Sequence, residues 1–307
     1  MAQKEEGNLK KSITVYGLLT SVSFQQAKIA AETIASKRKD VFSSNKSVGM
    51  LECDWMQFIT TVKRTKQGET WGFKDETLVF IGENPLGSAE YFINWLATEY
   101  EYEEFRPLPL FYAMAKEEYK NHLLESGHEF VFLSITVANE PAGKILIELF
   151  TDKCPKTCEN FKQLCIGEKE EKERHSPPLS LTYKRSIFHR IVPNGWIQGG
   201  DFEGGSGTGG ESIYGETFED ENFSAKHDKR GMVGMANKGR HSNGSQFYIT
   251  LQPAPWMDTQ YVAFGKVIEG TETLNELEKQ ETYNERPVKE CRISDCGVLD
   301  VHSLYQV

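Results

Sequence analysis

Hydrophobic and polar positions in the first hundred residues follow two different periods. The stretch SITVYGLL, residues 12–19, is a short apolar run, which predicts a β-strand. The next stretch, SFQQAKIAAETIASKRK at residues 23–39, predicts a helix with Ser23 as its N-cap and basic residues in its last turn. Its apolar positions recur at helical spacing: Phe24, Ala27, Ala30, Ala31 and Ile34.

A second strand and helix pattern follows at residues 77–100. TLVFIGENPLGS, residues 77–88, reads as strand, turn and short strand, with Gly82 and Asn84-Pro85 marking the turn. AEYFINWLATEY, residues 89–100, is an amphipathic helix. The pattern therefore predicts a small α/β domain over residues 12–100, preceded by a flexible tail at residues 1–11.

Residues 101–127 are predicted to be a helical connector. The Arg-Pro-Leu-Pro run at 106–109 breaks regular structure, and residues 110–124 are helical in pattern. The apolar positions of this helix lie on or near one face: Phe111, Met114, Ala115, Tyr119 and Leu123. Either this helix packs between the domains or it binds a partner, and the pattern alone leaves both open.

From residue 128 the pattern becomes that of an all-β domain. EFVFLSITVANEPAGKILIELF predicts a hairpin that turns at Pro-Ala-Gly, residues 141–143. Later apolar runs are short and separated by glycines, namely SIFHRIV, WIQGGD, GMVGMAN, QFYITL, VAFGKVI and CRISDCG. Helical patterns occur in TCENFKQLCIG and at residues 271–280. Many short strands with turns predict a closed β-barrel over residues 128–298, followed by a tail at 299–307.

Composition narrows the classes of function. The chain has 307 residues, 38% hydrophobic and 26% charged, which suits about two globular domains. A net charge of −10 disfavours non-specific binding to nucleic acid or anionic membranes. No apolar run is long enough to span a membrane, and MAQKEEGNLKKS lacks the apolar core of a signal peptide, so we expect a cytoplasmic protein. The six cysteines lack zinc-site spacing with histidines, so we expect buried reduced thiols, no metal and no cofactor.

A glycine-rich run, GGSGTGGESIYG at residues 204–215, raises the question of a nucleotide site. Gly205, Gly207 and Gly210 satisfy the G-x-G-x-x-G pattern. No amphipathic helix begins after Gly210, and the acidic stretch at 211–221 would repel a phosphate. We therefore interpret the run as a surface loop.

Five motifs occur together in the second half of the chain. They are PKTCENFKQLC (155–165), FHRIVPNGWIQGGDF (188–202), MANKGRHSNGSQFYITL (235–251), PWMDTQYVAFGKVIEG (255–270) and CRISDCG (291–297). In this order they resemble the cyclophilin family. The resemblance implies an eight-stranded barrel with two capping helices and a site for proline-containing peptides on its outer face. It also implies rotation about Xaa–Pro bonds, whose barrier is roughly 18–20 kcal/mol.

The resemblance assigns roles to individual residues. Arg190 matches the catalytic arginine, whose permanent charge would favour the deconjugated prolyl nitrogen. Gln198 matches the glutamine that hydrogen-bonds the substrate backbone, and Trp256 matches the tryptophan that binds substrate and cyclosporin. The remaining substrate-binding positions are Ala236, Asn237, Phe247, Tyr248, Met257 and Tyr261.

The chain also departs from the family pattern in the proline pocket. Gly195 replaces an aromatic wall, and Trp196 replaces a methionine. Tyr248 brings a hydroxyl into an apolar floor, which costs about 1–3 kcal/mol if it is unpaired. Met257 and Tyr261 are milder changes. A further departure is a charged and proline-containing insertion at residues 170–182, which we interpret as a solvated loop or a partner contact.

The N-terminal α/β domain resembles a thioredoxin or glutaredoxin module. LVFIGENPLGSAEYFINWL has the order of that family's last strand pair and final helix. The position of the redox pair, between the first strand and first helix, reads TSVSF and holds no cysteine. We therefore predict a module without thiol redox chemistry.

Two hypotheses of function remain. The altered pocket and the cysteine-less module favour a protein-interaction or structural protein that is weak or inactive as an isomerase. The retained Arg190, Gln198 and Trp256 favour the alternative, an active peptidyl-prolyl isomerase on protein substrates. Resemblance to a cyclophilin subfamily with an N-terminal module further implies a larger assembly, the axoneme of the cilium.

Overall fold

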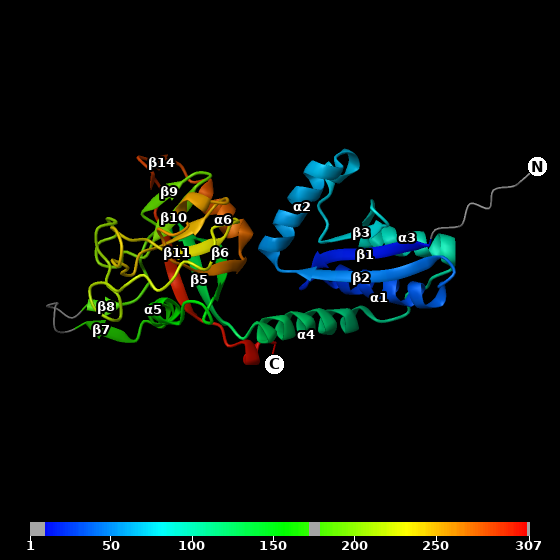
Figure 1. The fold of residues 1–307 in the computed structure, drawn as a ribbon, viewed down its shortest axis with the longest axis horizontal. Coiled ribbons are helices and arrows are strands. Elements are labelled where there is room, and N and C mark those ends of the chain that lie inside the picture. The colour runs from blue at the N-terminus through cyan, green and yellow to red at the C-terminus, as the bar shows by residue number, and fades with distance from the viewer. Residues whose placement is uncertain (1–9, 172–178, 306–307) are drawn as a thin grey trace, which may run out of the picture. The chain divides into compact units, whose positions relative to one another are not determined.

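The computed structural model describes residues 10–171 and 179–305. The chain divides into two compact units, Met1–Glu125 with Tyr305–Val307, and Ser126–Leu304 (Figure 1). Each unit has its own sheet, so each is described by itself.

The first unit is a four-stranded mixed sheet with helices on both faces (Figure 1). The strand order is β2-β1-β3-β4, in which β1 runs parallel to β2 and antiparallel to β3. The elements are β1 (Lys11–Leu18), α1 (Val22–Lys37), β2 (Phe42–Met50), α2 (Glu52–Lys66), η1 (Gly68–Gly72), β3 (Thr77–Ile81), β4 (Asn84–Ser88), α3 (Ala89–Tyr100) and α4 (Leu108–Ser126).

The central strand β1 builds both apolar layers because successive side chains point to opposite faces. Ile13 and Val15 pack in a core with α1 and α3, while Tyr16 and Leu18 pack in a second core with α2. The predicted core positions of α1 are all buried: Phe24, Ala27, Ala30, Ala31 and Ile34.

Two local predictions in this unit are wrong. Helix α1 begins two residues earlier than expected, with Ser21 rather than Ser23 at the N-cap, because Ser23 already has helical neighbours and bonds Thr77. The β3–β4 turn is at Gly82-Glu83, and Asn84 and Pro85 belong to β4. Gly82 adopts a positive φ of 62°, which a glycine accommodates without strain.

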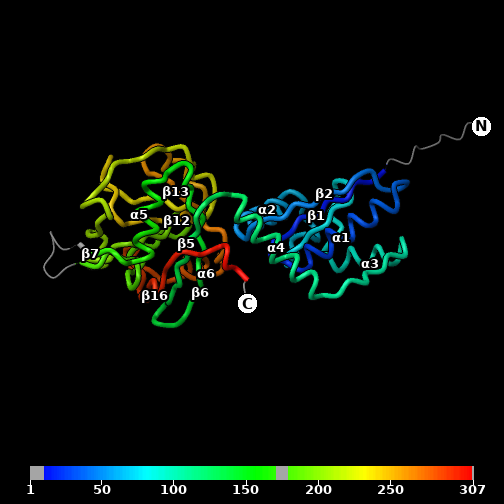
Figure 2. Tube along the Cα trace, turned by 90° about the horizontal axis from the view of Figure 1, so that it is seen from below, coloured from blue at the N-terminus to red at the C-terminus, as the bar shows by residue number. Residues whose placement is uncertain are grey.

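The second unit is an eight-stranded antiparallel sheet that curls around its core (Figures 1 and 2). The strand order is β16-β5-β6-β13-β11-β12-β10-β9. The elements are β5 (Glu129–Val137), β6 (Glu140–Leu149), α5 (Pro155–Ile166), β7 (Lys169–Glu171), β8 (Leu179–Leu181), β9 (Arg190–Val192), β10 (Trp196–Gly199), β11 (Met232–Met235), β12 (Phe247–Thr250), η2 (Pro255–Met257), β13 (Ala263–Glu269), α6 (Thr271–Glu278), β14 (Thr282–Tyr283), β15 (Arg286–Pro287), β16 (Cys291–Val298) and η3 (Val301–Ser303).

The edges of this sheet approach each other through one isolated bridge. Ile187, just before β9, pairs with Arg292 of β16, and the Phe188 N–H donates to the Cys291 carbonyl at 2.9 Å. The eight strands and the two helices α5 and α6 agree with the expected architecture. Closure into a complete barrel stays a prediction.

The interior of the curled sheet is aromatic. Phe161 of α5 makes tilted or edge-on contacts with Tyr183, Phe247 and Phe264, with ring centroids 5.0–5.1 Å apart. Helix α5 starts with Pro155 in its first turn and ends at Gly167, whose φ is 75°. This packing holds β12 in place, and β12 carries residues of the candidate site.

The first hairpin turns three residues earlier than predicted. Ala138 and Asn139 form the turn with φ of 51° and 68°, a two-residue turn whose twist suits antiparallel strands. The predicted turn at 141–143 lies inside β6 and is irregular in register. The strands were therefore predicted correctly, but their connection was not.

The predicted insertion at 170–182 lies partly within the described residues. Its flanks pair as β7 and β8, whereas residues 172–178 lie outside the described residues. In the described part of the chain no disulfide joins the cysteines, of which Cys53 and Cys296 are half-buried and the others are buried. In that same part, no helix combines the length and apolar character needed to cross a membrane.

Candidate functional site

A cavity of about 250 Å³ lies where β9, β10, β11 and β12 meet the η2 turn. Most of the residues predicted from the sequence line it together: Arg190, Trp196, Gln198, Ala236, Asn237, Tyr248, Trp256, Met257 and Tyr261. Trp256 is 56% exposed at its rim, and Met257 and Tyr248 are buried in its floor. The structure therefore assembles one pocket from three separate motifs of the sequence.

Two predicted residues lie elsewhere. Phe247 is fully buried and faces the aromatic interior, because it alternates with Tyr248 along β12. Gly195 lies in the turn between β9 and β10, where its N–H donates to the Val192 carbonyl at 2.9 Å. A Cβ at Gly195 would lie 2.9 Å from a Val192 methyl carbon, so an aromatic residue there requires Val192 to move.

Arg190 is held by two neighbours. Its Nε donates to Glu285 Oε2 at 2.6 Å, and its guanidinium carbon lies 5.0 Å from the centre of the Trp196 ring. The geometry is that of a cation over an aromatic face, which favours Arg and Trp. The arginine side chain is 41% exposed, so solvent can still reach it.

The pocket floor contains a buried hydrogen-bonded chain. Tyr248 Oη lies 2.6 Å from His227 Nε2, and His227 Nδ1 lies 2.8 Å from Asp258 Oδ1. Because a carboxylate can only accept, His227 Nδ1 carries a proton, and in the neutral imidazole Nε2 accepts from the tyrosine hydroxyl. The Tyr248 hydroxyl is therefore paired, so the cost expected for an unpaired hydroxyl does not arise, and burial raises the pKa of Tyr248 well above its usual range.

The hydroxyl fits because residue 234 is a glycine. A Cβ built on Gly234 would overlap the Tyr248 hydroxyl oxygen and lie 2.5 Å from its Cζ. We expect Gly234→Ala to lower the free energy of unfolding by about 2 kcal/mol, since overpacking a core typically costs about 1–3 kcal/mol. Chemical denaturation would measure this loss.

Gly204→Ala is the matched control, because a Cβ there meets nothing within 4 Å. Tyr248→Phe combined with Gly234→Ala should recover part of the lost stability. An unfolding free energy that is equal in Gly234→Ala and Gly204→Ala would contradict this account of the floor.

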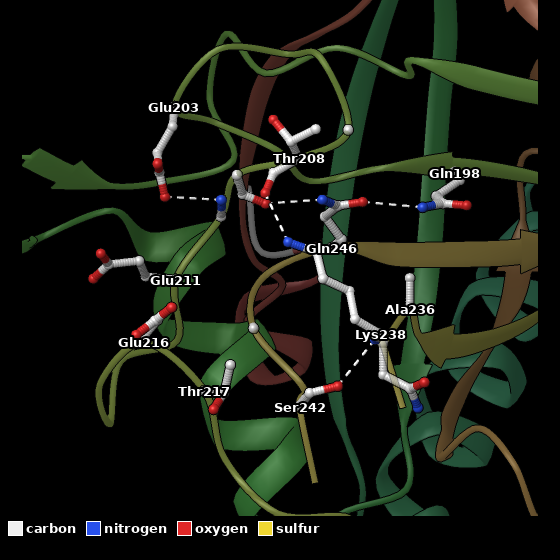
Figure 3. Close-up of a pocket in the computed structure, with 15 residues that line it drawn as sticks. Gln198, Glu203, Thr208, Glu211, Glu216, Thr217, Ala236, Lys238, Ser242 and Gln246 are labelled. Carbon is white, nitrogen blue, oxygen red and sulfur yellow. Dashed lines mark hydrogen bonds between the residues drawn. The ribbon is translucent and has the colours of Figure 1, made fainter. Parts of the chain in front are cut away.

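A second cavity of about 510 Å³ adjoins the first and shares Gln198, Ala236 and Asn237 with it (Figure 3). Gln246 Nε2 donates to the Gly209 carbonyl at 2.8 Å, and Gln198 Nε2 donates to Gln246 Oε1 at 3.0 Å. Lys238 reaches across to the Thr208 carbonyl at 2.9 Å (Figure 3). The two cavities therefore form one groove, with Gln198 between them.

The glycine-rich loop of this groove is organised by one buried carboxylate. Asp201, 1% exposed, accepts the N–H groups of Glu203, Gly204, Gly207 and Gly209 at 2.8–3.2 Å. Burial raises the pKa of Asp201, but these four hydrogen bonds outweigh it and hold the pKa below its usual range. Loop N–H groups are thus used internally, which agrees with the interpretation of a surface loop rather than a phosphate site.

Comparisons with known proteins agree with this geometry. Residues 132–298 match the family described as Cyclophilin type peptidyl-prolyl cis-trans isomerase/CLD. The chain belongs to the cyclophilin family. The resemblance inferred from the five motifs is therefore confirmed, and three of those motifs supply the residues that line the pocket described above.

Two curated cyclophilin relatives match nearly the whole chain. The human protein named "Probable inactive peptidyl-prolyl cis-trans isomerase-like 6" is 46% identical over 93% of this chain and 91% of its own length. The mouse protein of the same name is 46% identical over 94% and 91%. A solved Cryptosporidium parvum cyclophilin covers 56% of this chain and 98% of its own, with 38% identity and a TM-score of 0.49.

Several residues of this cyclophilin site were missed by sequence reasoning. His227, Asp258 and Gly234 support the floor, Asp201 orders the glycine loop, and Glu285 holds Arg190. The Asn-Glu pair in TYNERP was a turn signal for Glu285. No periodicity marks the contact between His227 and Tyr248, because it joins a loop residue before β11 to a residue of β12.

Proposed function

We propose that this chain is a cyclophilin-fold binding protein for proline-containing protein segments, with little or no isomerase turnover. The observation that carries the proposal is the altered relation of Arg190 and Trp196. Trp196 lines the pocket and lies under the guanidinium, in the position where the cyclophilin resemblance implies a methionine. The names of the human and mouse relatives support the same conclusion.

The chemistry explains why binding survives and turnover does not. Rotation about an Xaa–Pro bond needs no nucleophile or metal, only stronger interactions with the twisted amide than with the planar one. Trp256, Met257 and Tyr261 offer an apolar surface for a proline ring, and Gln198 offers an amide to the peptide backbone. Arg190 stacks on Trp196 and pairs with a carboxylate, so part of its positive charge is compensated before a peptide binds. Less of that charge is then available to stabilise the twisted amide.

The test is a titration of a short Xaa-Pro peptide followed by NMR, with exchange spectroscopy on the same samples. We expect the wild type to bind, with shifts at pocket residues, while cis–trans exchange stays at the uncatalysed rate. Trp256→Ala should weaken binding about tenfold, since a well-placed tryptophan is worth at least about 1.4 kcal/mol. Trp196→Met should increase the rate of cis–trans exchange, because the smaller methionine leaves more room in the pocket.

Arg190→Ala separates this proposal from its alternative. Exchange above background in the wild type that disappears in Arg190→Ala would establish an active isomerase, the function favoured by the joint presence of Arg190, Gln198 and Trp256 in one cavity. Absence of any peptide binding would overturn the binding proposal. A cyclosporin-type ligand, which the resemblance assigns to Trp256, is a second probe of the same pocket.

We also propose that the first unit is a thioredoxin-like module with a structural or binding role and no thiol redox chemistry. Its support is the β2-β1-β3-β4 order and the helices on both faces. Where a redox pair would lie, Ser21 and Ser23 hydroxyls are 2.8 Å apart, and Ser23 bonds Thr77. A role for the chain in an axonemal assembly, and its place in the cytoplasm or cilium, stay predictions.

A further inference from the structure

The hairpin of β14 and β15 lies beside the candidate catalytic arginine. Its two turn residues, Asn284 and Glu285, have φ of 48° and 65°. Asn tolerates this left-handed region, but Glu has no local reason to adopt it. Non-glycine residues held in this region often belong to functional sites, so the contacts of the Glu285 side chain are of interest.

The hairpin is fixed to the site by its backbone. The Ile191 N–H donates to the Glu285 carbonyl at 2.7 Å, so Glu285 is anchored at the residue following Arg190. Arg286 donates from Nη2 to the Gly205 carbonyl at 3.1 Å and ties the same hairpin to the glycine-rich loop. The Glu285 carboxylate is therefore delivered to Arg190 by a short, doubly anchored segment.

The resulting ion pair compensates the positive charge of Arg190, which isomerisation would use. Glu285 Oε2 accepts from Arg190 Nε at 2.6 Å, while the guanidinium face lies on Trp196. The Arg190–Glu285 ion pair is neutral overall, so it offers less positive charge to the prolyl nitrogen of an incoming segment than an unpaired guanidinium would. A ligand must compete with Glu285 for the same arginine.

We propose that Glu285 is a self-inhibiting positioning residue, which pairs with Arg190 and lowers both the affinity of the groove for prolyl segments and any residual isomerase rate. This inference rests on the proposed function, because it requires that prolyl segments enter the groove. It goes further, because it assigns the low activity to a contact within the chain as well as to the shape of the pocket.

The experiment compares wild type, Glu285→Gln and Glu281→Gln with a short Xaa-Pro peptide. Glu281→Gln is the matched control, because it removes the same charge from the start of the same hairpin, where the Glu281 backbone bonds Val288. We expect Glu285→Gln to bind about three- to fivefold more tightly than wild type at low salt, the range of an exposed ion pair. At about 1 M salt, where such pairs are screened, the difference should fall below about twofold.

A second readout needs no peptide. The Arg190 Nε–H signal in ¹⁵N NMR should shift and exchange with water roughly fivefold faster in Glu285→Gln, and it should be unchanged in Glu281→Gln. Glu285→Asn, which suits the left-handed turn, should give the same result as Glu285→Gln and guards against a folding defect.

The outcomes separate the two proposals. If the Arg190 signal changes but no variant binds peptide, the proposed binding function fails and the pairing of Glu285 with Arg190 stands. If peptide binds equally to wild type and Glu285→Gln, with an unchanged Arg190 signal, the self-inhibition proposal is overturned and the binding function stands. Weaker binding in Glu285→Gln would also overturn it, because Glu285 would then support the arginine.

Discussion

Replacing Asp201 with Ala is expected to lower the free energy of unfolding by about 3–5 kcal/mol, since it removes a buried carboxylate from several hydrogen bonds. Four N–H groups of the glycine-rich loop converge on this one side chain. Glycines cost the most backbone entropy to order, so this loop depends on a strong internal acceptor. Without it we expect the wall of the second cavity to lose its shape.

The measurement is chemical denaturation of the full chain, with peptide binding measured in parallel. Asp228→Ala is the control, because Asp228 is an exposed aspartate in the same unit. We expect that control to change the free energy of unfolding by less than about 0.5 kcal/mol. A loss in Asp201→Ala no larger than in Asp228→Ala would show that the loop is held by other contacts.

Acid should weaken the stabilisation that Asp201 gives to the glycine-rich loop. The pKa of Asp201 is lower in the folded protein than its unfolded value of about 3.9, so its contribution is complete above that value. The contribution is lost as the pH falls through the lower folded pKa. The stability difference between wild type and Asp201→Asn should therefore be constant near neutral pH and shrink below about pH 4.

The sequence predicted the structure best where the hydrophobic pattern depends on a single helix or strand. The helical spacing of Phe24, Ala27 and Ile34 reports a single buried face, and the structure buries all three. By contrast, β2 (Phe42–Met50) and α2 (Glu52–Lys66) were not predicted. Strand β2 is an edge strand with few buried side chains, so its sequence FSSNKSVGM carries little apolar alternation.

The candidate site was predictable as a set of positions but not as a set of contacts. Motifs placed Arg190, Gln198 and Trp256 in one pocket, as the structure does. They could not show that Glu285, distant in sequence, is brought to Arg190 by the turn of a hairpin and a backbone bond to Ile191. Contacts of this kind depend on how distant segments of the chain are placed in the fold, which no local sequence pattern encodes.

The fate of Tyr248 makes the same point in energetic terms. Taken alone, a hydroxyl in an apolar floor suggests a destabilised and degraded pocket. With His227 and Asp258 it becomes the end of a satisfied chain, and Gly234 leaves room for it. Buried polar chains of this kind are stabilising only when every member is paired, so the residue that matters most is the one in the middle.

Replacing His227 with Ala is therefore expected to cost about 3–5 kcal/mol of unfolding free energy, because it opens a cavity and leaves the buried Tyr248 hydroxyl unpaired. His227 is fully buried, and its loss removes the side-chain partner of the Tyr248 hydroxyl, whereas Asp258 Oδ1 keeps the backbone N–H of residue 227. Tyr248→Phe should cost less, about 1–2 kcal/mol, since only His227 Nε2 loses its partner. Chemical denaturation of the two single variants and the double variant would measure these values.

The double variant decides whether the chain acts as a unit. Once His227 is absent, Tyr248→Phe removes an unpaired hydroxyl instead of breaking a bond, so it should cost nothing further or restore part of the stability. His302→Ala, at a histidine of the 3-10 turn η3, is the control for loss of an imidazole outside the floor. Strictly additive losses in the double variant would mean that the hydroxyl and imidazole do not interact, and the pocket floor would then rest on apolar packing alone.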